Sequence, residues 1–162
     1  MWVLVPLIVS TRLEGTSLSL AAFSIIGSGA IGCVVGGLLV RRFGSARVAG
    51  AQLATSGLCC VLAPWLMDAG TMWFGLWLLV WGITVSGDSP QFSTLTANNT
   101  PRHAVGSVLT LANSMGFAIS VVSIELFVEL LKTHSLASVL PWLGLGPLLG
   151  LWGLRVLLRE GA

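Results

Sequence analysis

The chain has 162 residues, of which 55% are hydrophobic and 9% are charged, and its formal net charge is +2. Soluble domains of ordinary composition carry about 25% charged residues. So few charges cannot cover a water-facing surface, which excludes a disordered chain, a basic nucleic-acid-binding module and an ordinary soluble enzyme. We therefore expect the lipid bilayer to be the solvent and first partner of most of the chain.

The apolar segments, taken in chain order, predict an all-α integral membrane protein with five full transmembrane helices and one partial helix at the N-terminus. A spanning helix needs about 20 residues, so the first apolar segment is too short to cross a bilayer. The expected spans are residues 1–10 (partial), 17–40, 48–67, 72–98, 105–131 and 139–158. Because short loops join them, residues 1–162 form a single transmembrane helical bundle in this prediction.

Basic residues are concentrated in alternate loops, which predicts the orientation of the bundle. One side of the membrane would carry Arg41, Arg42, Arg47, Arg102, Arg155 and Arg159, whereas the opposite side would carry Arg12 and Lys132. Loops rich in lysine and arginine stay in the cytoplasm. We therefore expect a multi-pass protein of the plasma or inner membrane, with the 41–47 loop and the C-terminus in the cytoplasm.

Glycines recur at helical spacing in the 17–40 segment, where Gly32 and Gly36 lie four residues apart. Glycine removes side-chain bulk and lets two helix backbones approach closely within a membrane. Two interpretations stay open for this stripe. It forms either a static packing contact between two helices or a contact along which two moving bundles slide.

The loop that follows this segment combines glycine and arginine in a specific pattern. The positions that define the pattern are Gly37, Leu39, Arg42, Gly44 and Arg47. At this spacing the loop resembles the Gly-x-Leu-x-Asp-Arg-x-Gly-Arg-x-basic loop of the major facilitator superfamily, although Arg41 replaces the usual Asp and Ser45 replaces a frequent Arg. Residues 101–106 and 113–117 are similar to the stretch that enters the eleventh helix of that family.

The resemblance covers nearly the whole chain but only one half of a family member, which has twelve helices in two bundles. It implies helices seven (partial) to twelve, the C-terminal half of a secondary active transporter that moves a small solute by alternating access. It also implies a small molecule or ion as substrate, no cofactor, and an N-terminal six-helix half or a second copy of the chain as partner. Because Met1 falls within a helix, the alternative is a truncated, non-transporting membrane fragment or an interaction subunit.

Asp88 is the principal charged candidate because it lies inside an expected span. In the family, the Asp of the short loop belongs to an ion-pair latch, and Arg41 reverses that charge here. The candidate latch therefore consists of Gly37, Arg41, Arg42, Gly44, Arg47 and Asp88. Three roles stay open for the carboxylate: an ion pair with Arg41 or Arg42, coupling to a proton or substrate, and a water-exposed position at a helix end.

A stripe of small polar residues follows one face of the 105–131 segment. Its members are Thr110, Asn113, Gly116, Ser120 and Ser123, spaced three or four residues apart. Such a stripe either lines a water-filled path or hydrogen-bonds a neighbouring helix, and both interpretations stay open. In the first case, the candidate substrate pathway consists of Gln91, Asn113, Gly116 and Ser120.

No arrangement in the sequence indicates catalysis or a metal site. The two histidines, His103 and His134, fall in loops on opposite sides of the expected bundle. No nucleophile is placed beside a base at a spacing typical of an active site. We therefore expect no enzymatic activity, no metal ligand and no nucleic-acid partner.

Overall fold

The computed structural model describes residues 3–160, with side chains described through residue 155. Its helices, in chain order, are α1 (Leu4–Val9), α2 (Gly15–Phe43), α3 (Ser45–Met67), α4 (Thr71–Asn98), α5 (Val105–Leu131), α6 (Leu136–Val139), the 3₁₀ helix η1 (Leu140–Gly144) and α7 (Leu145–Glu160). No β-strand occurs in residues 3–160, so the prediction of an all-helical chain is confirmed. The first two residues of the expected partial span and the side chain of Arg159 lie outside the described part.

Four stretches of helix are both long enough and apolar enough to cross a membrane: Gly15–Phe43, Ser45–Met67, Val105–Leu131 and Leu136–Arg155. They make the protein membrane-associated, as its composition predicts. The expected count of five full spans and one partial span is not confirmed. The helix α4 is long enough at 28 residues, but its second half is polar and contains Asp88, which lowers its apolar character.

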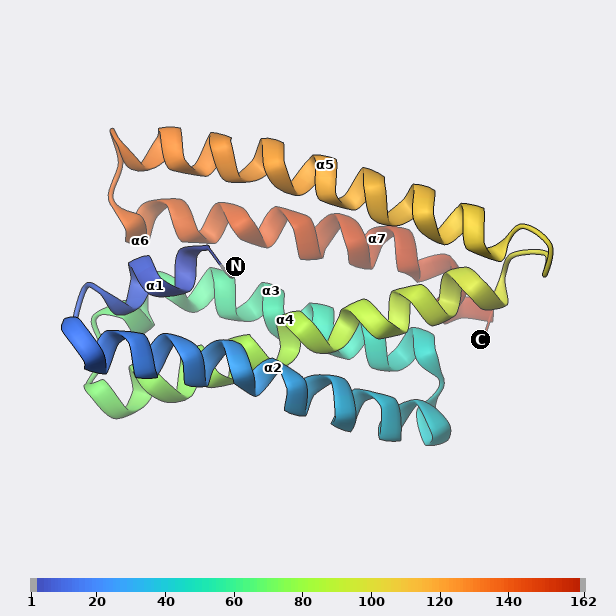
Figure 1. Ribbon diagram of the computed structural model, residues 1–162. Helices are drawn as coiled ribbons and strands as arrows, with labels where there is room; N and C mark the ends of the chain where they lie inside the picture. Colours follow the sequence, from blue (N-terminus) through green and yellow to red (C-terminus); the bar gives the residue numbers. More distant parts are fainter. Residues whose placement is uncertain (1–2, 161–162) are drawn as a thin grey trace.

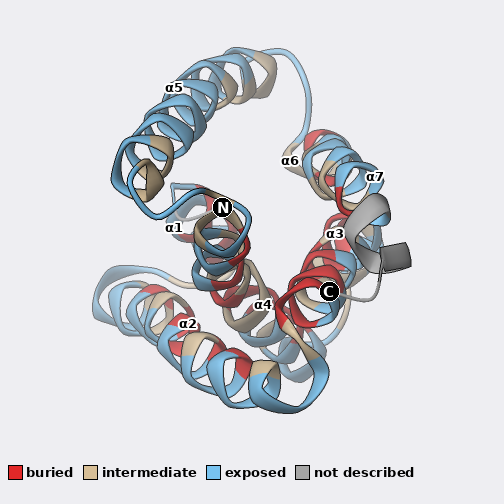
Figure 2. Ribbon diagram, turned by 90° about the vertical axis from the view of Figure 1, so that its right-hand side faces the viewer, coloured by how far each residue is buried: buried red, intermediate tan, exposed pale blue. Residues whose placement is uncertain are grey.

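The helices run roughly along one common direction, with α4 between α2 and α3 (Figure 1). On the far side of α3 lie η1 and α7, while the short helix α1 packs against α2. In the view of Figure 2, buried residues gather on α3 and α4, and α5 stands apart from this unit. The main contacts of α5 are with α4 and with α6, and none of its residues is buried.

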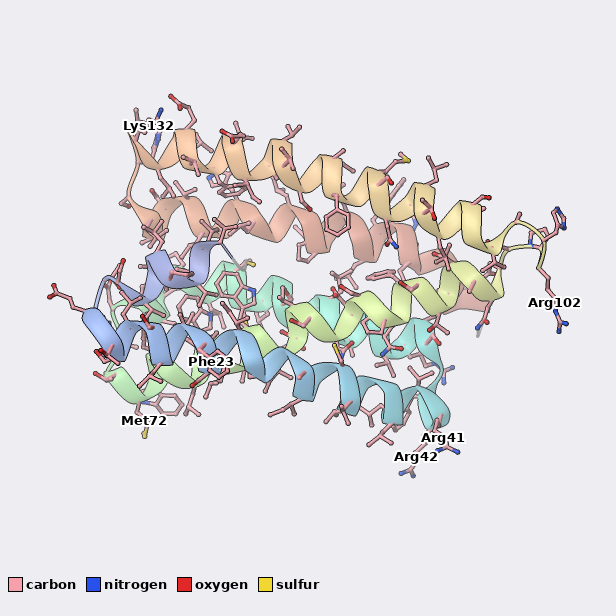
Figure 3. All side chains as sticks on the ribbon, in the orientation of Figure 1. Phe23, Arg41, Arg42, Met72, Arg102 and Lys132 are labelled. Carbon is pink, nitrogen blue, oxygen red and sulfur yellow. The ribbon has the colours of Figure 1, made fainter. Side chains whose placement is uncertain are left out.

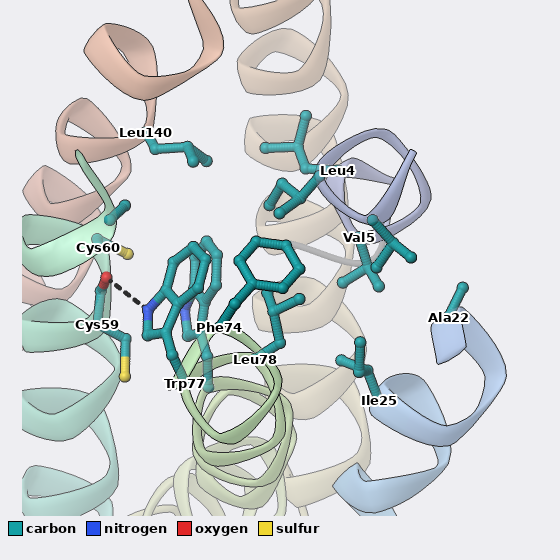
Figure 4. Packing of buried hydrophobic residues seen from close by; sticks show 14 residues of the cluster. Leu4, Val5, Ala22, Ile25, Cys59, Cys60, Phe74, Trp77, Leu78 and Leu140 are labelled. Atoms are coloured by element: carbon teal, nitrogen blue, oxygen red, sulfur yellow. Dashed lines mark hydrogen bonds between the residues drawn. The ribbon is translucent and has the colours of Figure 1, made fainter. Parts of the chain in front are cut away.

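The tightest apolar packing is an aromatic core at one end of the bundle, built around Phe74, Trp77 and Trp81 of α4 (Figure 4). The indoles of Trp77 and Trp81 are stacked, with ring centroids 5.4 Å apart. The Trp77 Nε1–H donates a hydrogen bond of 3.0 Å to the carbonyl oxygen of Cys59 in α3. This bond satisfies the buried indole N–H of Trp77 and fixes α4 against α3.

Arg12, in the turn between α1 and α2, ties this same end together. Its guanidinium donates a hydrogen bond to the carbonyl oxygen of Met67 at the end of α3. The guanidinium carbon also lies 4.5 Å from the centre of the Phe74 ring, which is cation–π geometry. One arginine therefore connects the α1–α2 turn with both α3 and α4.

Glycines allow the backbones of α2 and α4 to touch. A Cβ atom on Gly32 would lie 1.9 Å from the carbonyl oxygen of Ile83, and one on Gly82 would lie 2.5 Å from that of Ile25. No side chain fits at such distances, so both positions require glycine. The stripe expected from the sequence is thus a direct contact between helices.

Candidate functional site

The loop of the sequence motif forms a tight turn between α2 and α3 at the end of the bundle that carries Arg41, Arg42 and Arg102 (Figure 3). Gly44 has φ 83°, a conformation that favours glycine. Its N–H caps α2 by donating a hydrogen bond of 2.9 Å to the carbonyl oxygen of Val40. The side chains of Arg41, Arg42 and Arg47 are all exposed. Gly37 faces open space.

Asp88 does not meet these arginines in the structure. It is half-buried in α4, and its recorded side-chain hydrogen bond comes from the hydroxyl of its neighbour Ser89, at 3.4 Å. Among the described side chains, the one salt bridge joins Lys132 to Glu129 at 2.6 Å, far from the loop. Asp88 and the loop arginines of the expected latch are therefore present, but no ion pair joins them among the described side chains.

Two glutamines meet at the contact between α2, α3 and α4. The amide nitrogens of Gln52 and Gln91 lie 2.8 Å and 3.0 Å from the position that a Cβ on Gly36 would occupy. Gln52 Nε2 donates to the carbonyl oxygen of Gly32 at 3.3 Å, whereas Gln52 Oε1 and Gln91 Nε2 are buried without a hydrogen-bond partner among the described residues. Gln91 is only 3% exposed, so this contact between the two glutamines, which we call the glutamine junction, is polar and enclosed.

A cavity of about 240 Å³, open on one side and lined by no buried residue, lies between α4 and α5, and we call it the α4–α5 cavity. Its lining consists of Ser89, Phe92, Ser93, Thr96, Leu109, Ala112 and Asn113. A second cavity of about 500 Å³, between α4 and α7, shares Phe92 and Thr96 with it. The polar face of α4 is therefore open to α5 on one side and to α7 on the other.

A third cavity, of about 280 Å³, continues along α5 toward α1 and η1. Ser120 and Ser123 line it opposite Leu4 and Leu143. The two serine hydroxyls donate to carbonyl oxygens of their own helix, at 2.8 Å and 2.7 Å. Their hydrogens are thus used within α5, and their lone pairs are free to accept hydrogen bonds.

The structure separates the residues that were expected to form one pathway. Asn113 and Ser120 line cavities on the inner face of α5, and Gly116 lies between them with open space around its α-carbon. Gln91 lies at the glutamine junction, on almost the opposite side of α4 from Ser93, because successive helical positions turn through about 100°.

Sequence reasoning missed Gln52 and the polar face of α4 formed by Ser89, Ser93 and Thr96. The three α4 residues are spaced four and three apart, so a test for helical periodicity detects them as one face. Gln52 is a single amide in an otherwise small and apolar segment. A polar residue in such a setting is itself a signal.

Comparisons with known proteins do not identify a function for the chain, so the functional proposal below is argued from the geometry of the site. No family model, no curated protein and no solved structure matches the chain.

Proposed function

We propose that the chain is one helical bundle of a secondary active transporter of the major facilitator type, and that the α4–α5 cavity belongs to its solute pathway. The observation that carries the proposal is the gathering of hydroxyl and amide groups from two helices, including Ser93 and Asn113, in a cavity within a bundle of apolar helices. Polar groups are costly in lipid unless they serve each other or a water-filled path. The serine hydroxyls of the α5 stripe donate to carbonyl oxygens of their own helix, so the stripe does not act as a donor to a neighbouring helix.

Alternating access moves one bundle against another as largely rigid bodies, with gating elements that move beside them. The α2–α3–α4 unit supplies the rigid body through backbone contacts at Gly32 and Gly82 and through the aromatic core. The helix α5 supplies the less restrained element because none of its residues is buried. A shift of α5 relative to α4 would change the α4–α5 cavity without breaking the core.

A complete pathway needs a second wall, which one bundle does not provide. An N-terminal six-helix half or a second copy of this chain would supply it, with the solute held between the two. One end of the bundle carries the exposed arginines Arg41, Arg42 and Arg102. They favour placing that end on the cytoplasmic side of the plasma or inner membrane. The C-terminal end of α7 lies at the same end (Figure 1).

A non-transporting interaction subunit is the second candidate function. The observation in its favour is the same exposure of α5, where Phe117 is 75% exposed and both faces of the helix lack a tight partner. In this alternative, the α4–α5 cavity is covered by another membrane protein and holds no water. Accessibility to an aqueous reagent distinguishes the two functions.

The test uses single cysteines in the full chain, in native membranes, on a Cys33→Ala background that removes the half-buried native thiol. We expect a membrane-impermeant maleimide to label Asn113→Cys, because a thiol in a water-filled path ionises and reacts. Met115→Cys, almost on the opposite face of the same helix from Asn113, should stay unlabelled, and Arg102→Cys in the exposed loop should label as a positive control. An unreactive Asn113→Cys beside a reactive Arg102→Cys would overturn the transport proposal.

A further inference from the structure

The second cavity beside α4 lies on the opposite side from α5, between α4 and α7, and we call it the α4–α7 groove. Its volume is about 500 Å³, and its lining includes Leu95 and Asn99 of α4 and Gly153 and Leu154 of α7. The groove lies toward the C-terminal ends of both helices, at the end of the bundle that carries Arg102 (Figures 1 and 3). It is therefore open to the leaflet that surrounds this end.

The floor of the groove is apolar and closely packed. Ala46 and Ala49 of α3 are fully buried. They form one cluster with the buried side chains of Leu95 and Leu154, and Phe92 packs against this cluster. Because lipid tails are as apolar as such side chains, an acyl chain can lie on this surface without losing any hydration.

The polar groups of the groove lie on the last turns of α4. The Thr96 hydroxyl donates to the carbonyl oxygen of Phe92 at 2.9 Å, so its hydrogen is used within the helix. Asn99, the C-cap of α4, donates one amide hydrogen to the carbonyl oxygen of Leu95, also at 2.9 Å. Its second amide hydrogen has no recorded partner among the described residues and is free to bind an acceptor at the mouth of the groove.

Arginines stand at the rim of the groove on three different segments. Arg47 comes directly after the floor residue Ala46, and Arg155 comes directly after the wall residue Leu154. Arg102 lies in the loop that follows α4. All three side chains are exposed, and none of them forms a salt bridge with a described side chain. Neighbouring helical positions turn through about 100°, which places Arg47 and Arg155 beside the groove and not in its lining.

This rim has positive charge without a neighbouring carboxylate. No aspartate or glutamate of the described residues lines the groove. Asp88 lies on α4 one helical turn before Phe92, toward the middle of the helix. At 1.5 Å per residue, it is about 16 Å from Asn99 along the helix axis, far from the mouth. The charge at the mouth is therefore complementary to an anion whose apolar part enters the groove.

We propose that the α4–α7 groove binds one anionic phospholipid of the surrounding leaflet. One acyl chain lies on the floor beside Leu95 and Leu154, and the phosphate accepts hydrogen bonds at the mouth from Asn99, Arg102 and Arg155. Arginines on three segments suit a phospholipid headgroup, which extends over more of the rim than the carboxylate of a fatty acid. This inference goes beyond the proposed function, because it holds equally for a transporter and for an interaction subunit.

The experiment measures how lipids stabilise the full chain in mild-detergent micelles. Thermal unfolding is followed by circular dichroism with equal concentrations of dioleoylphosphatidylglycerol, dioleoylphosphatidylcholine or oleate. A lipid that binds only the folded protein raises the midpoint in a saturable way, which gives its Kd. We expect phosphatidylglycerol to bind at least about tenfold more tightly than phosphatidylcholine, because the chains are identical and only the headgroup charge differs. Native mass spectrometry should show one retained phosphatidylglycerol.

Two glycines of α7 provide a matched pair for the groove. A Cβ on either Gly146 or Gly153 would meet nothing within 4 Å, but only Gly153 lines the groove. Gly153→Leu should fill the space of the acyl chain and remove the saturable stabilisation by phosphatidylglycerol. Gly146→Leu makes the same change on the same helix and should keep it. The midpoint of each variant without lipid is its own reference, so a change in basal stability does not affect the comparison.

Three arginines at the same end test the headgroup contact. Arg102→Gln and Arg155→Gln should each weaken phosphatidylglycerol binding about fivefold, the contribution of one arginine near an anionic lipid surface. Arg42→Gln removes the same charge from α2, which contributes no residue to the groove, and should have a clearly smaller effect. High salt should weaken binding to the unmodified chain as well.

The remaining outcomes would overturn the proposal. Equal stabilisation by phosphatidylglycerol and phosphatidylcholine would exclude the anionic headgroup, and equal stabilisation by oleate would identify a fatty acid as the occupant. No stabilisation by any of the three would mean that the groove is covered by protein, either a second copy or another partner. Equal losses in Gly146→Leu and Gly153→Leu, or in the three arginine variants, would place the lipid elsewhere. None of these results changes the labelling test of the α4–α5 cavity, so the two proposals fail separately.

Discussion

The successive helices α4 and α5 have nearly the same length, 28 and 27 residues, and opposite surroundings. α4 contains eight buried residues, whereas α5 contains none. Yet α5 is apolar along its length, whereas the second half of α4 is polar. In lipid, the more hydrophobic helix is thus the more exposed one, because lipid tails solvate apolar side chains as well as a protein core does.

Shape and hydrogen bonding explain which helix is enclosed. Gly82 lets α4 touch the backbone of α2, and the Trp77 indole reaches a carbonyl of α3. The helix α5 also has a glycine in its middle, Gly116, but a Cβ there would meet nothing within 4 Å. Small residues therefore create a contact only where a partner helix is present to use it. Four predictions test this contrast, from the largest expected effect to the smallest.

The largest effect is expected at the α2–α4 contact. Gly32→Ala should lower the free energy of unfolding by about 3 kcal/mol, because the new methyl group would overlap the backbone of Ile83 and force the helices apart. Gly37→Ala on the same helix, and Gly116→Ala on α5, face open space and should be neutral or slightly stabilising. Unfolding in mixed detergent micelles, followed by tryptophan fluorescence, measures all three. Similar losses in Gly32→Ala and Gly37→Ala would contradict the contact.

A smaller loss is expected in the aromatic core. Trp77→Phe should cost about 1–3 kcal/mol, because it removes the hydrogen bond to the Cys59 carbonyl oxygen and leaves part of a buried indole's volume empty. Phe117→Leu on α5 should change stability by less than about 0.5 kcal/mol, since Phe117 is 75% exposed and lipid solvates either side chain. The same unfolding assay applies. Because the Trp77→Phe variant removes a fluorophore, circular dichroism of the helices serves as a second readout. A destabilised Phe117→Leu would show that α5 has a partner.

At the glutamine junction the expected effect changes sign. Gln91→Leu should raise the free energy of unfolding by about 1 kcal/mol, because it replaces a buried amide whose nitrogen is unpaired. Gln52→Leu should not stabilise, since Gln52 donates to the carbonyl oxygen of Gly32. Thermal denaturation in detergent compares the two. Destabilisation by Gln91→Leu would mean that its amide has a partner in the folded protein.

The smallest effect is expected at Asp88. Asp88→Asn should change stability by less than about 0.5 kcal/mol, because the carboxylate is half-buried and forms no salt bridge with the described residues. Arg41→Gln and Arg42→Gln should be equally mild, since both side chains are exposed. A double-mutant cycle between Asp88 and each arginine measures any coupling. A coupling well above 1 kcal/mol would restore the latch expected from the sequence.

The helical nature of the chain and its membrane environment were predictable from local sequence. The apolar run 17–40 corresponds to α2, which extends from Gly15 to Phe43 because Arg41 and Arg42 continue the helix beyond the apolar region. The last expected span is divided into α6, η1 and α7, with Pro141 at the start of η1. The length of an apolar segment does not by itself predict such a division.

The candidate site was only partly predictable. Asn113 and Ser120 share a face of α5, and that face does line cavities. Gln91 was grouped with them because it is polar, but helix rotation places it against Gly36 on another side of α4. Ser93 and Gln52 escaped notice because the direction in which a polar side chain points depends on which helices are neighbours.

By itself, the sequence determined that the chain is helical and that lipid surrounds it, because both follow from the length of apolar runs and the scarcity of charges. The tertiary structure decided which helices are enclosed and which faces meet. The physical reason is that a membrane provides no hydrophobic gradient to mark an inward face, so the partners were selected by close backbone approach and by hydrogen bonds. Gly82 and Trp77 of α4 meet such partners in α2 and α3, whereas a Cβ on either Gly106 or Gly116 of α5 would meet nothing within 4 Å.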